Sequence, residues 1–512
     1  MSDQTIVVLD FGGQYNHLIA RRIRELGVRS VLLPHDTTLA KIRKEYDVAG
    51  IILSGSYSSV RKPDFLSMDE KILFSGIPVL GICYGMQLIA KLMGGQVIPA
   101  AKSEYGKQSV SIKNSESLLF RGVGQKTEVF MSHKDVVDAL PKDFVIDASA
   151  SDSMVAAIEH VTLPIYGVQF HPEVTHTIEG MRMLDNFISL VCRASKTWKM
   201  DAFAEEKANE IQNTVKDEKV LLGLSGGVDS AVTAMLVHKA IGSNLTCVFV
   251  DHGLLRKNES DEVMHSLSGK FGLNIIRVDA SDRFLEKLHG VTDPETKRKI
   301  IGNEFIKVFE ETANKLGDLA FLAQGTLYTD KVESGTGASA TIKSHHNVGG
   351  LPDHMNLRLL EPLDTLFKDE VRKLGLTLGL PESLVNRQPF PGPGLAIRII
   401  GEITKDRLNL VKESDAILRE EIFANGLDKE TWQYFTLLPG VHTVGVMGDE
   451  RTYGELIVIR AVSSVDGMTA DWAKLPYDVL DKISIRIVNE VSGITRVAYD
   501  ITSKPPGTIE WE

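Results

Sequence analysis

The sequence has few cysteines, no long apolar run and no excess of positive charge. Only three cysteines occur among 512 residues, and a sparse, odd number indicates free thiols in a reducing compartment: Cys83, Cys192 and Cys247. No run approaches the ~18–20 apolar residues of a membrane span. Residues 1–10 lack the basic and apolar segments of a signal peptide. We therefore expect a cytoplasmic protein that has no membrane partner.

The overall charge also limits the classes of partner. The formal net charge is −11, which argues against a general affinity for nucleic-acid backbone, so we expect no nucleic-acid partner. A local basic site for a phosphorylated substrate stays open. With 43% hydrophobic and 24% charged residues, the composition excludes a disordered or fibrous chain. At roughly 100–200 residues per domain, the length predicts about three domains.

Short apolar runs and amphipathic stretches alternate along the first third of the chain. The spacing predicts helices at 15–26 and 86–93, and strands at 5–9, 28–33, 51–53, 78–82 and 165–170. This alternation is typical of an α/β domain with a doubly wound parallel sheet. We place the first domain at residues 1–199.

The strand at 78–82 runs into Gly-Ile-Cys-Tyr-Gly at 81–85, with the cysteine at position 83. A nucleophile between two glycines, after a strand and before a helix, is the pattern of a nucleophile elbow. The glycines permit a sharp turn, and the N-terminus of the helix favours a thiolate. The alternative is that Cys83 is one more small buried apolar residue.

The segment His171-Pro172-Glu173 argues against that alternative. Positions 171 and 173 of an extended chain point to the same side, so His171 can take the thiol proton while Glu173 orients the ring. Together with the elbow, this spacing resembles the triad of the class I glutamine amidotransferases over about residues 5–195. The resemblance includes the segments at 10–12 and 132–133. It implies that glutamine is hydrolysed through a thioester on Cys83, which releases ammonia.

One loop departs from the pattern of that family. The oxyanion loop usually reads Ser-Gly-Gly-Pro, whereas residues 54–57 here are Ser-Gly-Ser-Tyr. The backbone N–H groups of Gly55 and Tyr84 are the oxyanion donors that the resemblance implies. A donor of this kind is a backbone group, so side-chain identity acts only through conformation, and one lost donor costs roughly 10²–10³ in rate. We expect a working site whose basal glutaminase activity Ser56 could alter.

A second glycine-rich turn lies near the middle of the chain, at 225–230. A strand predicted at 220–224 leads into it and a helix predicted at 231–240 leaves it. Glycines let the backbone approach a ligand, and the helix N-terminus suits an anion such as phosphate or pyrophosphate. The alternative is a turn with no ligand. A Walker A loop is excluded, because no Lys-Ser/Thr pair follows Gly227.

This turn resembles the pyrophosphate loop of the N-type ATP pyrophosphatases, which cleave ATP between the α- and β-phosphates and pass AMP to an oxygen of the substrate. Strands predicted at 245–250, 275–278 and 319–323 complete a second doubly wound parallel-sheet domain, at 200–387. Asp251 follows one of these strands and either meets the ribose or adenine region or caps a helix. Lys368 begins a predicted helix. Its side chain either points at the phosphates or lies on an exposed surface helix. The ATP-binding residues expected are Ser225, Gly226, Gly227, Val228, Asp229, Ser230, Ala231, Asp251 and Lys368.

The segment Gln-Pro-Phe-Pro-Gly-Pro-Gly at 388–394 separates the last part of the chain, because it cannot be helix interior or central strand. Helices predicted around 407–424 and 477–491, with strands around 441–446, 456–461 and 495–501, indicate a small α+β domain at 388–512. The tail at 504–512 contains two prolines and a tryptophan, which is unusual for a frayed end.

Five segments resemble the glutamine-hydrolysing GMP synthase family: 297–302, 342–350, 368–375, 388–398 and 504–512. The resemblance implies that 388–512 forms a homodimer and that the tail closes over xanthosine monophosphate (XMP). Arg298 and Lys504 are then the cations for its phosphate, with Glu510 supporting. A solvated helix face is otherwise the default for 297–299, and the glycine-flanked segment 342–350 is typical of a mobile lid.

The resemblance implies two half-reactions, in which ATP adenylates XMP and ammonia from glutamine displaces AMP to give GMP. Mg²⁺ is expected because the phosphate charge must be neutralised. Its ligands stay unassigned, since adjacent His345 and His346 do not face the same way. Three alternatives are a related amidating enzyme such as an NAD synthetase, a tRNA-thiolating pyrophosphatase and a non-enzymatic nucleotide sensor. The segments 388–398 and 504–511 argue against the first, and the scarcity of cysteine against the second.

Overall fold

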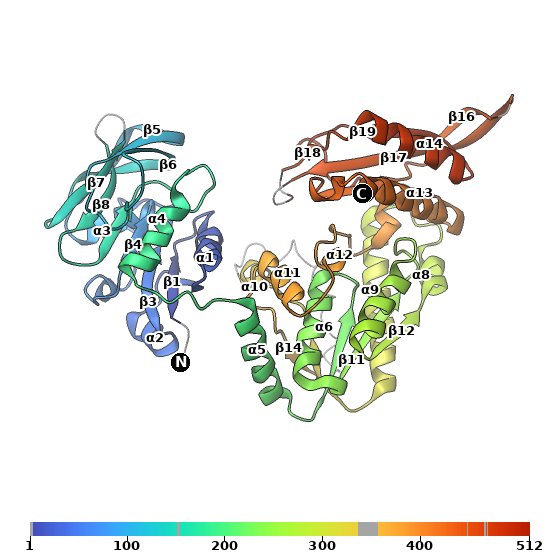
Figure 1. Cartoon of the computed structure of the whole chain (residues 1–512), viewed down its shortest axis with the longest axis horizontal. Coiled ribbons are helices and arrows are strands. Elements are labelled where there is room, and N and C mark those ends of the chain that lie inside the picture. The colour runs from blue at the N-terminus through green and yellow to red at the C-terminus, as the bar shows by residue number, and fades with distance from the viewer. Residues whose placement is uncertain (1–3, 151–153, 336–356, 448, 465–466, 468) are drawn as a thin grey trace. The chain divides into compact units, whose positions relative to one another are not determined.

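The computed structural model describes residues 4–150, 154–335, 357–447, 449–464, 467 and 469–512 (Figure 1). The chain forms two compact units, Met1–Ala202 and Phe203–Glu512. Within the described ranges, no helix has the length and apolar character needed to cross a membrane. The division into three domains at 199/200 and 387/388 stays a prediction.

The first unit is built on a nine-stranded sheet in the order β2-β1-β3-β4-β9-β8-β7-β5-β6. The pairs from β2 to β9 are parallel, and those from β9 to β6 are antiparallel. The strands are β1 (Thr5–Asp10), β2 (Arg29–Pro34), β3 (Val48–Leu53), β4 (Val79–Ile82), β5 (Gln96–Ile112), β6 (Lys126–Ala139), β7 (Phe144–Ala150), β8 (Val155–His160) and β9 (Ile165–Val168).

Four α-helices accompany this sheet: α1 (Asn16–Glu25), α2 (Leu39–Glu45), α3 (Tyr84–Leu92) and α4 (Gly180–Asn186). In α1, Ile19, Ala20 and Ile23 are buried, so one stripe of an otherwise polar helix packs on the sheet. The five strands predicted in this part of the chain are present as β1, β2, β3, β4 and β9.

The antiparallel strands β5 to β8 were not predicted. In β6, buried residues such as Val129, Met131 and Val137 alternate with exposed or half-buried ones. An antiparallel strand needs only one apolar face, so its sequence shows no continuous apolar run. This ribbon matters for the site, because it carries residues 132–135.

The second unit contains a five-stranded sheet in the order β12-β11-β10-β13-β14, and all its pairs are parallel. The strands are β10 (Lys219–Leu224), β11 (Leu245–Asp251), β12 (Ile275–Asp279), β13 (Leu319–Ala323) and β14 (Arg358–Leu360). The chain moves outward from β10 to β12 and then returns to the other side of β10. Ligands of such sheets bind beyond the carboxyl ends of the strands where the order reverses.

The helices of the second unit are α5 (Met200–Val215), α6 (Val228–Ile241), α7 (Glu259–Met264), α8 (Ser281–Leu288), α9 (Pro294–Leu316), α10 (Tyr328–Gly335), α11 (Lys368–Thr377), α12 (Glu382–Val385), α13 (Lys405–Ala424) and α14 (Tyr477–Glu490). Helix α5 begins in the first unit, at Met200, and continues into the second.

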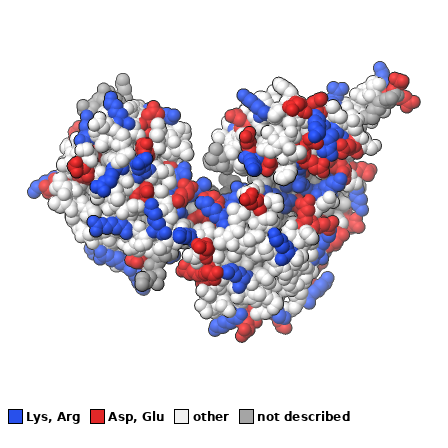
Figure 2. All heavy atoms as spheres, viewed as in Figure 1, with Lys and Arg blue, Asp and Glu red and all other residues white. Residues whose placement is uncertain are grey.

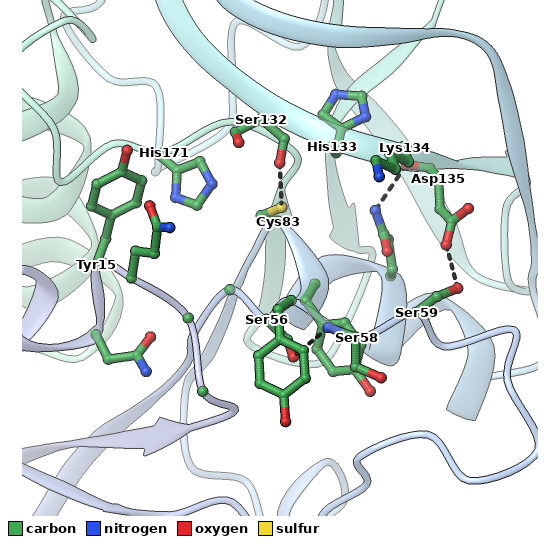
Figure 3. Close-up of a pocket in the computed structure, with 18 of the residues that line it drawn as sticks. Tyr15, Ser56, Ser58, Ser59, Cys83, Ser132, His133, Lys134, Asp135 and His171 are labelled. Atoms are coloured by element: carbon green, nitrogen blue, oxygen red, sulfur yellow. Dashed lines mark hydrogen bonds between the residues drawn. The ribbon is translucent and has the colours of Figure 1, made fainter. Parts of the chain in front are cut away.

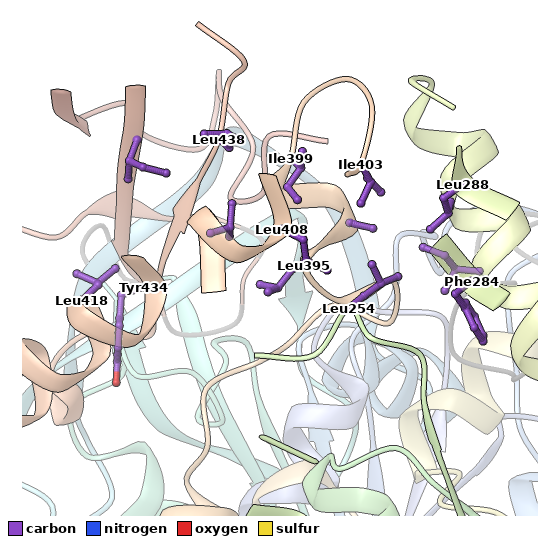
Figure 4. Close-up of a cluster of buried hydrophobic side chains, with 14 of the residues drawn as sticks. Leu254, Phe284, Leu288, Leu395, Ile399, Ile403, Leu408, Leu418, Tyr434 and Leu438 are labelled. Carbon is purple, nitrogen blue, oxygen red and sulfur yellow. The ribbon is translucent and has the colours of Figure 1, made fainter. Parts of the chain in front are cut away.

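A second sheet in this unit is centred on β17 (Glu450–Ser463). Its antiparallel neighbours are β15 (Gln433–Leu437), β16 (His442–Met447) and β18 (Asp471–Trp472), and β19 (Ile494–Asp500) runs parallel to it. Figure 4 shows the core beneath this sheet. One cluster of buried side chains contains Leu254 and Phe284, from the part of the chain that forms the five-stranded sheet. It also contains Leu395, Leu408 and Leu438, which follow residue 387. The predicted boundary at 387/388 is therefore crossed by a continuous apolar core.

The face of the molecule shown in Figure 2 carries acidic and basic side chains close together. In the second unit, for example, Arg486 of α14 pairs with Glu420 and Glu421 of α13 and with Glu490 of its own helix. Mixed charge of this kind produces no long-range field of one sign over that face.

Two carboxyl groups lie close together on β7 and β8 of the first unit, the buried Asp147 and the half-buried Glu159. Asn114 Nδ2 donates to Asp147 Oδ1 at 2.8 Å and to Glu159 Oε1 at 2.9 Å. Ser117 Oγ bonds the other oxygen of each carboxyl, at 3.0 and 2.8 Å. Burial and the nearby charge of Glu159 raise the pKa of Asp147 to about 7, against the bonds from Asn114 and Ser117. Like charges this close favour one shared proton.

This pair predicts how stability depends on pH. Because the folded pKa of Asp147 lies above its ordinary value of 3.8, the folded state binds the proton more tightly than the unfolded chain. The contribution is complete below pH ~4 and is lost as the pH rises through about 7. As the pH rises from 5 to 8, the free energy of unfolding measured by calorimetry should fall less for Asp147→Asn than for the wild type. Parallel pH curves for the two proteins would contradict this.

Candidate active sites

Cys83 lies at the junction of β4 and α3 with a φ of +53°, a conformation that a side chain rarely adopts. Gly81 and Gly85 must be glycines because other backbone atoms pack too closely to leave room for a Cβ. A Cβ at Gly81 would lie 2.5 Å from the carbonyl carbon of Gly85, and one at Gly85 would lie 2.4 Å from the oxygen of Leu53. The Cys83 N–H donates to Val168 O at 2.7 Å. The strained turn is thus held on both sides, as a nucleophile elbow requires.

His171 and Glu173 follow β9, and the structure brings them together. Nδ1 of His171 lies 2.7 Å from Oε1 of Glu173, and both side chains are buried. Burial alone would lower the pKa of His171, but the charge of Glu173 and hydrogen bonds with Cys83 and Glu173 hold it well above its ordinary value. Arg22 Nε fixes the main-chain oxygen of Glu173 at 3.0 Å. The arrangement favours the protonated imidazole of His171 beside the sulfur of Cys83.

The predicted oxyanion residues lie at the same place. A Cβ on Gly55 would be 3.2 Å from Cε1 of His171 and 3.9 Å from Cβ of Cys83, so the backbone of Gly55 lies directly beside both. Tyr84 is the first residue of α3, and its hydroxyl donates to Leu66 O at 2.6 Å. Tyr57, where the amidotransferase pattern has proline, is 85% exposed.

A cavity of about 320 Å³ opens over these groups. Figure 3 shows the ring of His171 next to the sulfur of Cys83, which donates to Ser132 O at 3.7 Å. The ring of Tyr15 meets His171 edge-on at 5.1 Å. Burial lowers the pKa of His133 to about 4, so this pocket residue is neutral. Sequence reasoning missed Tyr15, because a single aromatic residue at the start of a helix resembles ordinary core.

The second glycine-rich turn joins β10 to α6, as predicted. Gly226 has a φ of +76°. The hydroxyls of Ser225 and Ser230 lie 3.0 Å apart, and Ser230 Oγ also accepts from Ser225 N at 3.2 Å. The Gly227 N–H donates to Ser225 Oγ at 3.3 Å. These bonds close the loop on itself at the N-terminus of a 14-residue helix, where an anion is favoured.

Two further predicted residues lie at or near this loop. Lys368, the first residue of α11, places Nζ 2.7 and 2.6 Å from the two carboxylate oxygens of Asp229. Asp251, at the end of β11, accepts from Arg277 Nη2 at 2.8 Å and from Gly253 N at 3.1 Å. Burial would raise the pKa of Asp251, but these bonds lower it overall. Asp251 therefore stabilises its own turn while it lies at the carboxyl edge of the sheet.

The three residues predicted for XMP all contact the C-terminal region, in separate places. Arg298 Nη2 donates to Glu512 O at 2.7 Å, and Lys504 Nζ donates to Gly467 O at 2.8 Å. Glu510 accepts from Arg398 Nη2 at 2.9 Å and from Gln433 Nε2 at 2.8 Å.

The solvated face expected for residues 297–299 is wrong at Lys297, which is fully buried. Its Nζ donates to Ile399 O at 2.7 Å and to Glu512 Oε2 at 2.6 Å. A buried ammonium requires such partners, and they come from segments far away in the sequence. The helix pattern alone could not identify them.

Two buried arginines were not predicted as site residues. Asp415 lies 3.7 Å from Arg256 Nε and 3.9 Å from Arg398 Nη1, and Phe390 lies under both guanidinium groups. Burial lowers the pKa of Arg256 to about 10, although Asp415 opposes this. Nε and Nη2 of Arg256 and Nη1 of Arg398 have no hydrogen-bond partner among the described residues. Buried donors of this kind are typical of a site that binds an acceptor-rich ligand.

Comparisons with known proteins cover nearly the whole chain. Three family matches are found: Glutamine amidotransferase class-I at residues 7–190, NAD synthase at 202–303 and GMP synthase C terminal domain at 420–511. Proteins named GMP synthase (glutamine-hydrolyzing) from Bacillus cereus, Bacillus mycoides and Bacillus anthracis are each 58% identical over 508 residues, 99% of this chain and 99% of the relative. The chain belongs to the glutamine-hydrolysing GMP synthase family. The resemblance drawn from the motifs is confirmed.

Membership of the family does not by itself assign the individual residues, and their roles stay predictions. The predicted lid at 342–350 lies outside the described residues. Within the described part of the chain, no three His, Cys, Asp or Glu side chains form a group that could hold a metal ion.

The contact of Gly55 predicts the effect of a single methyl group. In Gly55→Ala the new Cβ would lie 3.2 Å from Cε1 of His171 and displace the ring, so glutamine-dependent activity should fall by ~10–100-fold. Synthesis from ammonium salts should be unchanged. Gly124→Ala is the matched control, because its Cβ meets only Lys126 O at an ordinary 3.4 Å. Wild-type glutaminase activity in Gly55→Ala would contradict the predicted position of the loop.

Proposed function

We propose that this chain converts XMP to GMP, taking ammonia from glutamine and cleaving ATP to AMP and pyrophosphate. The observation that carries the proposal is the presence of two strand-to-helix sites on one chain of this family. One unit holds Cys83 beside His171, and the other holds a closed anion-binding turn at 225–230.

In the glutaminase reaction, the Cys83 sulfur attacks the amide carbon of glutamine after its proton passes to His171. Glu173 stabilises the imidazolium, and the N–H groups of Gly55 and Tyr84 hold the oxyanion. His171 then gives the proton to the departing nitrogen, so ammonia leaves and a thioester remains. Water hydrolyses the thioester to glutamate and restores the thiol.

In the synthetase reaction, the C2 oxygen of XMP attacks the α-phosphorus of ATP and pyrophosphate leaves. The turn at 225–231 holds the pyrophosphate through backbone N–H groups and the dipole of α6. Lys368 exchanges its bond with Asp229 for a phosphate oxygen, and Asp251 faces the ribose. Ammonia then displaces AMP from C2 and forms GMP.

The described residues fit a Mg²⁺ ion that enters with ATP. Such an ion is bound by phosphate oxygens, water and one or two carboxylates, so a cage of three protein ligands is not required. Asp229, at the anion-binding turn, is the carboxylate placed to reach it. The ion would neutralise phosphate charge when bound.

For XMP we propose a phosphate site on Arg298 and Lys504, with Glu510 in support. In the described structure Lys504 bonds a neutral main-chain carbonyl, that of Gly467, whereas Arg298 bonds Glu512 O and pairs with the carboxylate of Glu295. A phosphate is a stronger acceptor than a peptide carbonyl, so at Lys504 the exchange favours the nucleotide. Arg398, which bonds Glu510, adds further positive charge and a buried donor without a hydrogen-bond partner among the described residues.

One assay tests this function. The protein is incubated with ATP, Mg²⁺, XMP and either glutamine or ammonium, and GMP is measured. Cys83→Ala should abolish synthesis from glutamine, a loss of at least ~10³-fold, because the nucleophile is absent, and should keep synthesis from ammonium. The wild type should use both nitrogen sources.

Absence of GMP from both sources would overturn the proposal and favour a nucleotide sensor. Amination of a nicotinic acid dinucleotide would indicate an NAD synthetase-like enzyme, and thiolation of tRNA would indicate the third alternative. GMP from ammonium alone in the wild type would mean that Ser56 and Tyr57 impair the first site.

We further propose that the parallel part of the nine-stranded sheet and the five-stranded sheet are both doubly wound, and that residues 388–512 form a homodimer in the cytoplasm. Support for the dimer comes from the ribbon of β16 and β17. Val444, Val446 and Tyr453 lie on one of its faces and are 46%, 73% and 71% exposed. Apolar side chains clustered on one face are typical of an interface.

A charge on that face should weaken the dimer. Val446→Asp should raise the dimer dissociation constant by at least ~10-fold, because burial of the carboxylate is costly. Analytical ultracentrifugation measures this. Val161→Asp, at a 55% exposed valine of the first unit, is the matched control. Equal association of both variants would exclude this ribbon as the interface.

A further inference from the structure

Behind the catalytic sulfur lie two glutamine side chains that have no role in the reaction described above. Gln169 lies just after β9, two residues before His171, and is fully buried. Its Nε2 lies 3.7 Å from Sγ of Cys83. Gln87, on α3 one turn after the cysteine, places Nε2 3.2 Å from Oε1 of Gln169. The same Nε2 lies 2.9 Å from the main-chain oxygen of Asp135 on β6.

These contacts determine which way each amide points. The main-chain oxygen of Asp135 can only accept a hydrogen bond, so the group of Gln87 that faces it must be the NH₂. The second hydrogen of that NH₂ meets Gln169, which must therefore present its oxygen to Gln87. The remaining end of the Gln169 amide is an N–H donor, and it points at the sulfur. A reversed amide would place a carbonyl oxygen against Cys83.

We propose that Gln169 is a positioning residue that stabilises the thiolate of Cys83, with Gln87 and the main chain of Asp135 holding its amide in the donating orientation. This rests on the proposed glutaminase role of Cys83. Hydrogen bonds to the charged form of a group favour that form. The N–H of Gln169 forms and breaks no covalent bond, because the thiol proton passes to His171.

The position of Gln169 separates this role from substrate binding. Gln87 lines the cavity together with Cys83 and His171, whereas Gln169 does not. The donor therefore reaches the sulfur from the protein interior and leaves the cavity side free for glutamine. In its thiol form the sulfur donates to Ser132 O at 3.7 Å on another side. That bond is lost when the proton passes to His171, whereas the N–H of Gln169 can still donate to the thiolate.

The test is the pH dependence of Cys83 alkylation by iodoacetamide in the full-length protein, read from the mass of the Cys83 peptide. Burial raises the pKa of both Cys192 and Cys247, so these thiols react slowly. Gln169→Met keeps the volume and removes the donor. We expect the midpoint of the alkylation profile to rise by about one pH unit, a tenfold loss of thiolate below the midpoint.

The same variant should lower kcat for glutamine hydrolysis at neutral pH by about tenfold while KM changes little, and higher pH should restore the rate. Synthesis from ammonium should be unchanged. A purely structural role would not shift the alkylation midpoint. Thr177→Val is the matched control: it removes a 2.6 Å bond to His171 O without touching the sulfur.

Gln87→Met provides a second test that does not depend on Gln169→Met folding, because it frees the amide of Gln169 to reverse. Its alkylation midpoint should also rise, and iodoacetamide does not require glutamine binding. An unchanged midpoint in whichever variant folds, or an equal shift in Thr177→Val, would overturn the proposal. Failure of the wild type to hydrolyse glutamine would refute the proposed function instead, while the alkylation profile would still decide the role of Gln169.

Discussion

The start of a helix directly after a buried parallel strand is the constraint on which both sites depend. The unpaired N–H groups of the first helical turn favour negative charge, and the strand end fixes where that charge must lie. At β4 and α3 the charge is the thiolate that we propose for Cys83. At β10 and α6 it is the pyrophosphate that we propose for residues 225–231. The chain uses one local geometry for a nucleophile and for a leaving group.

The first of these turns shows how the backbone strain is maintained. A φ of +53° at Cys83 costs free energy, on the order of 1–3 kcal/mol, and persists only when the surroundings determine it. Here they do so through Gly81 and Gly85, which pack without room for a methyl group, and through the bond to Val168. The imidazolium of His171 and the amide of Gln169 then meet the sulfur from different sides. Rigid surroundings are what allow these contacts to be maintained together.

In the second unit, buried ion pairs connect the C-terminal segment to residues that precede it by more than 100 positions. Lys297 on α9 bonds the last residue of the chain, and Arg398 bonds Glu510 near it. Removing one partner of such a pair leaves an uncompensated buried charge, which is strongly destabilising. The shared apolar core beneath the sheet acts in the same direction.

Much of the fold was predictable because its signals are local. A parallel strand buried on both faces is a continuous apolar run, and β1, β4, β10 and β11 were found in this way. The antiparallel strands β5 to β8 were missed, and in β6 the reason is that buried and exposed residues alternate and give no such run. His171 and Glu173 could be paired from their closeness in sequence together with the elbow, although the structure places Pro172 and Glu173 in a turn and not in the extended chain that the period of two assumes. Tyr15 and Gln169 could not be identified as site residues, because nothing in the neighbouring sequence distinguishes them from core residues.

The sequence by itself determined the family, the two turns and the chemistry of the residues within them, because each motif is a short run whose geometry is local. Only the tertiary structure decided which distant groups complete the sites. Lys368 meets Asp229 across 139 positions, and Gln169 meets Cys83 across 86. Lys297 became a buried ion pair rather than a solvated face. Burial and charge pairing depend on what packs against a residue, and no local pattern contains that information.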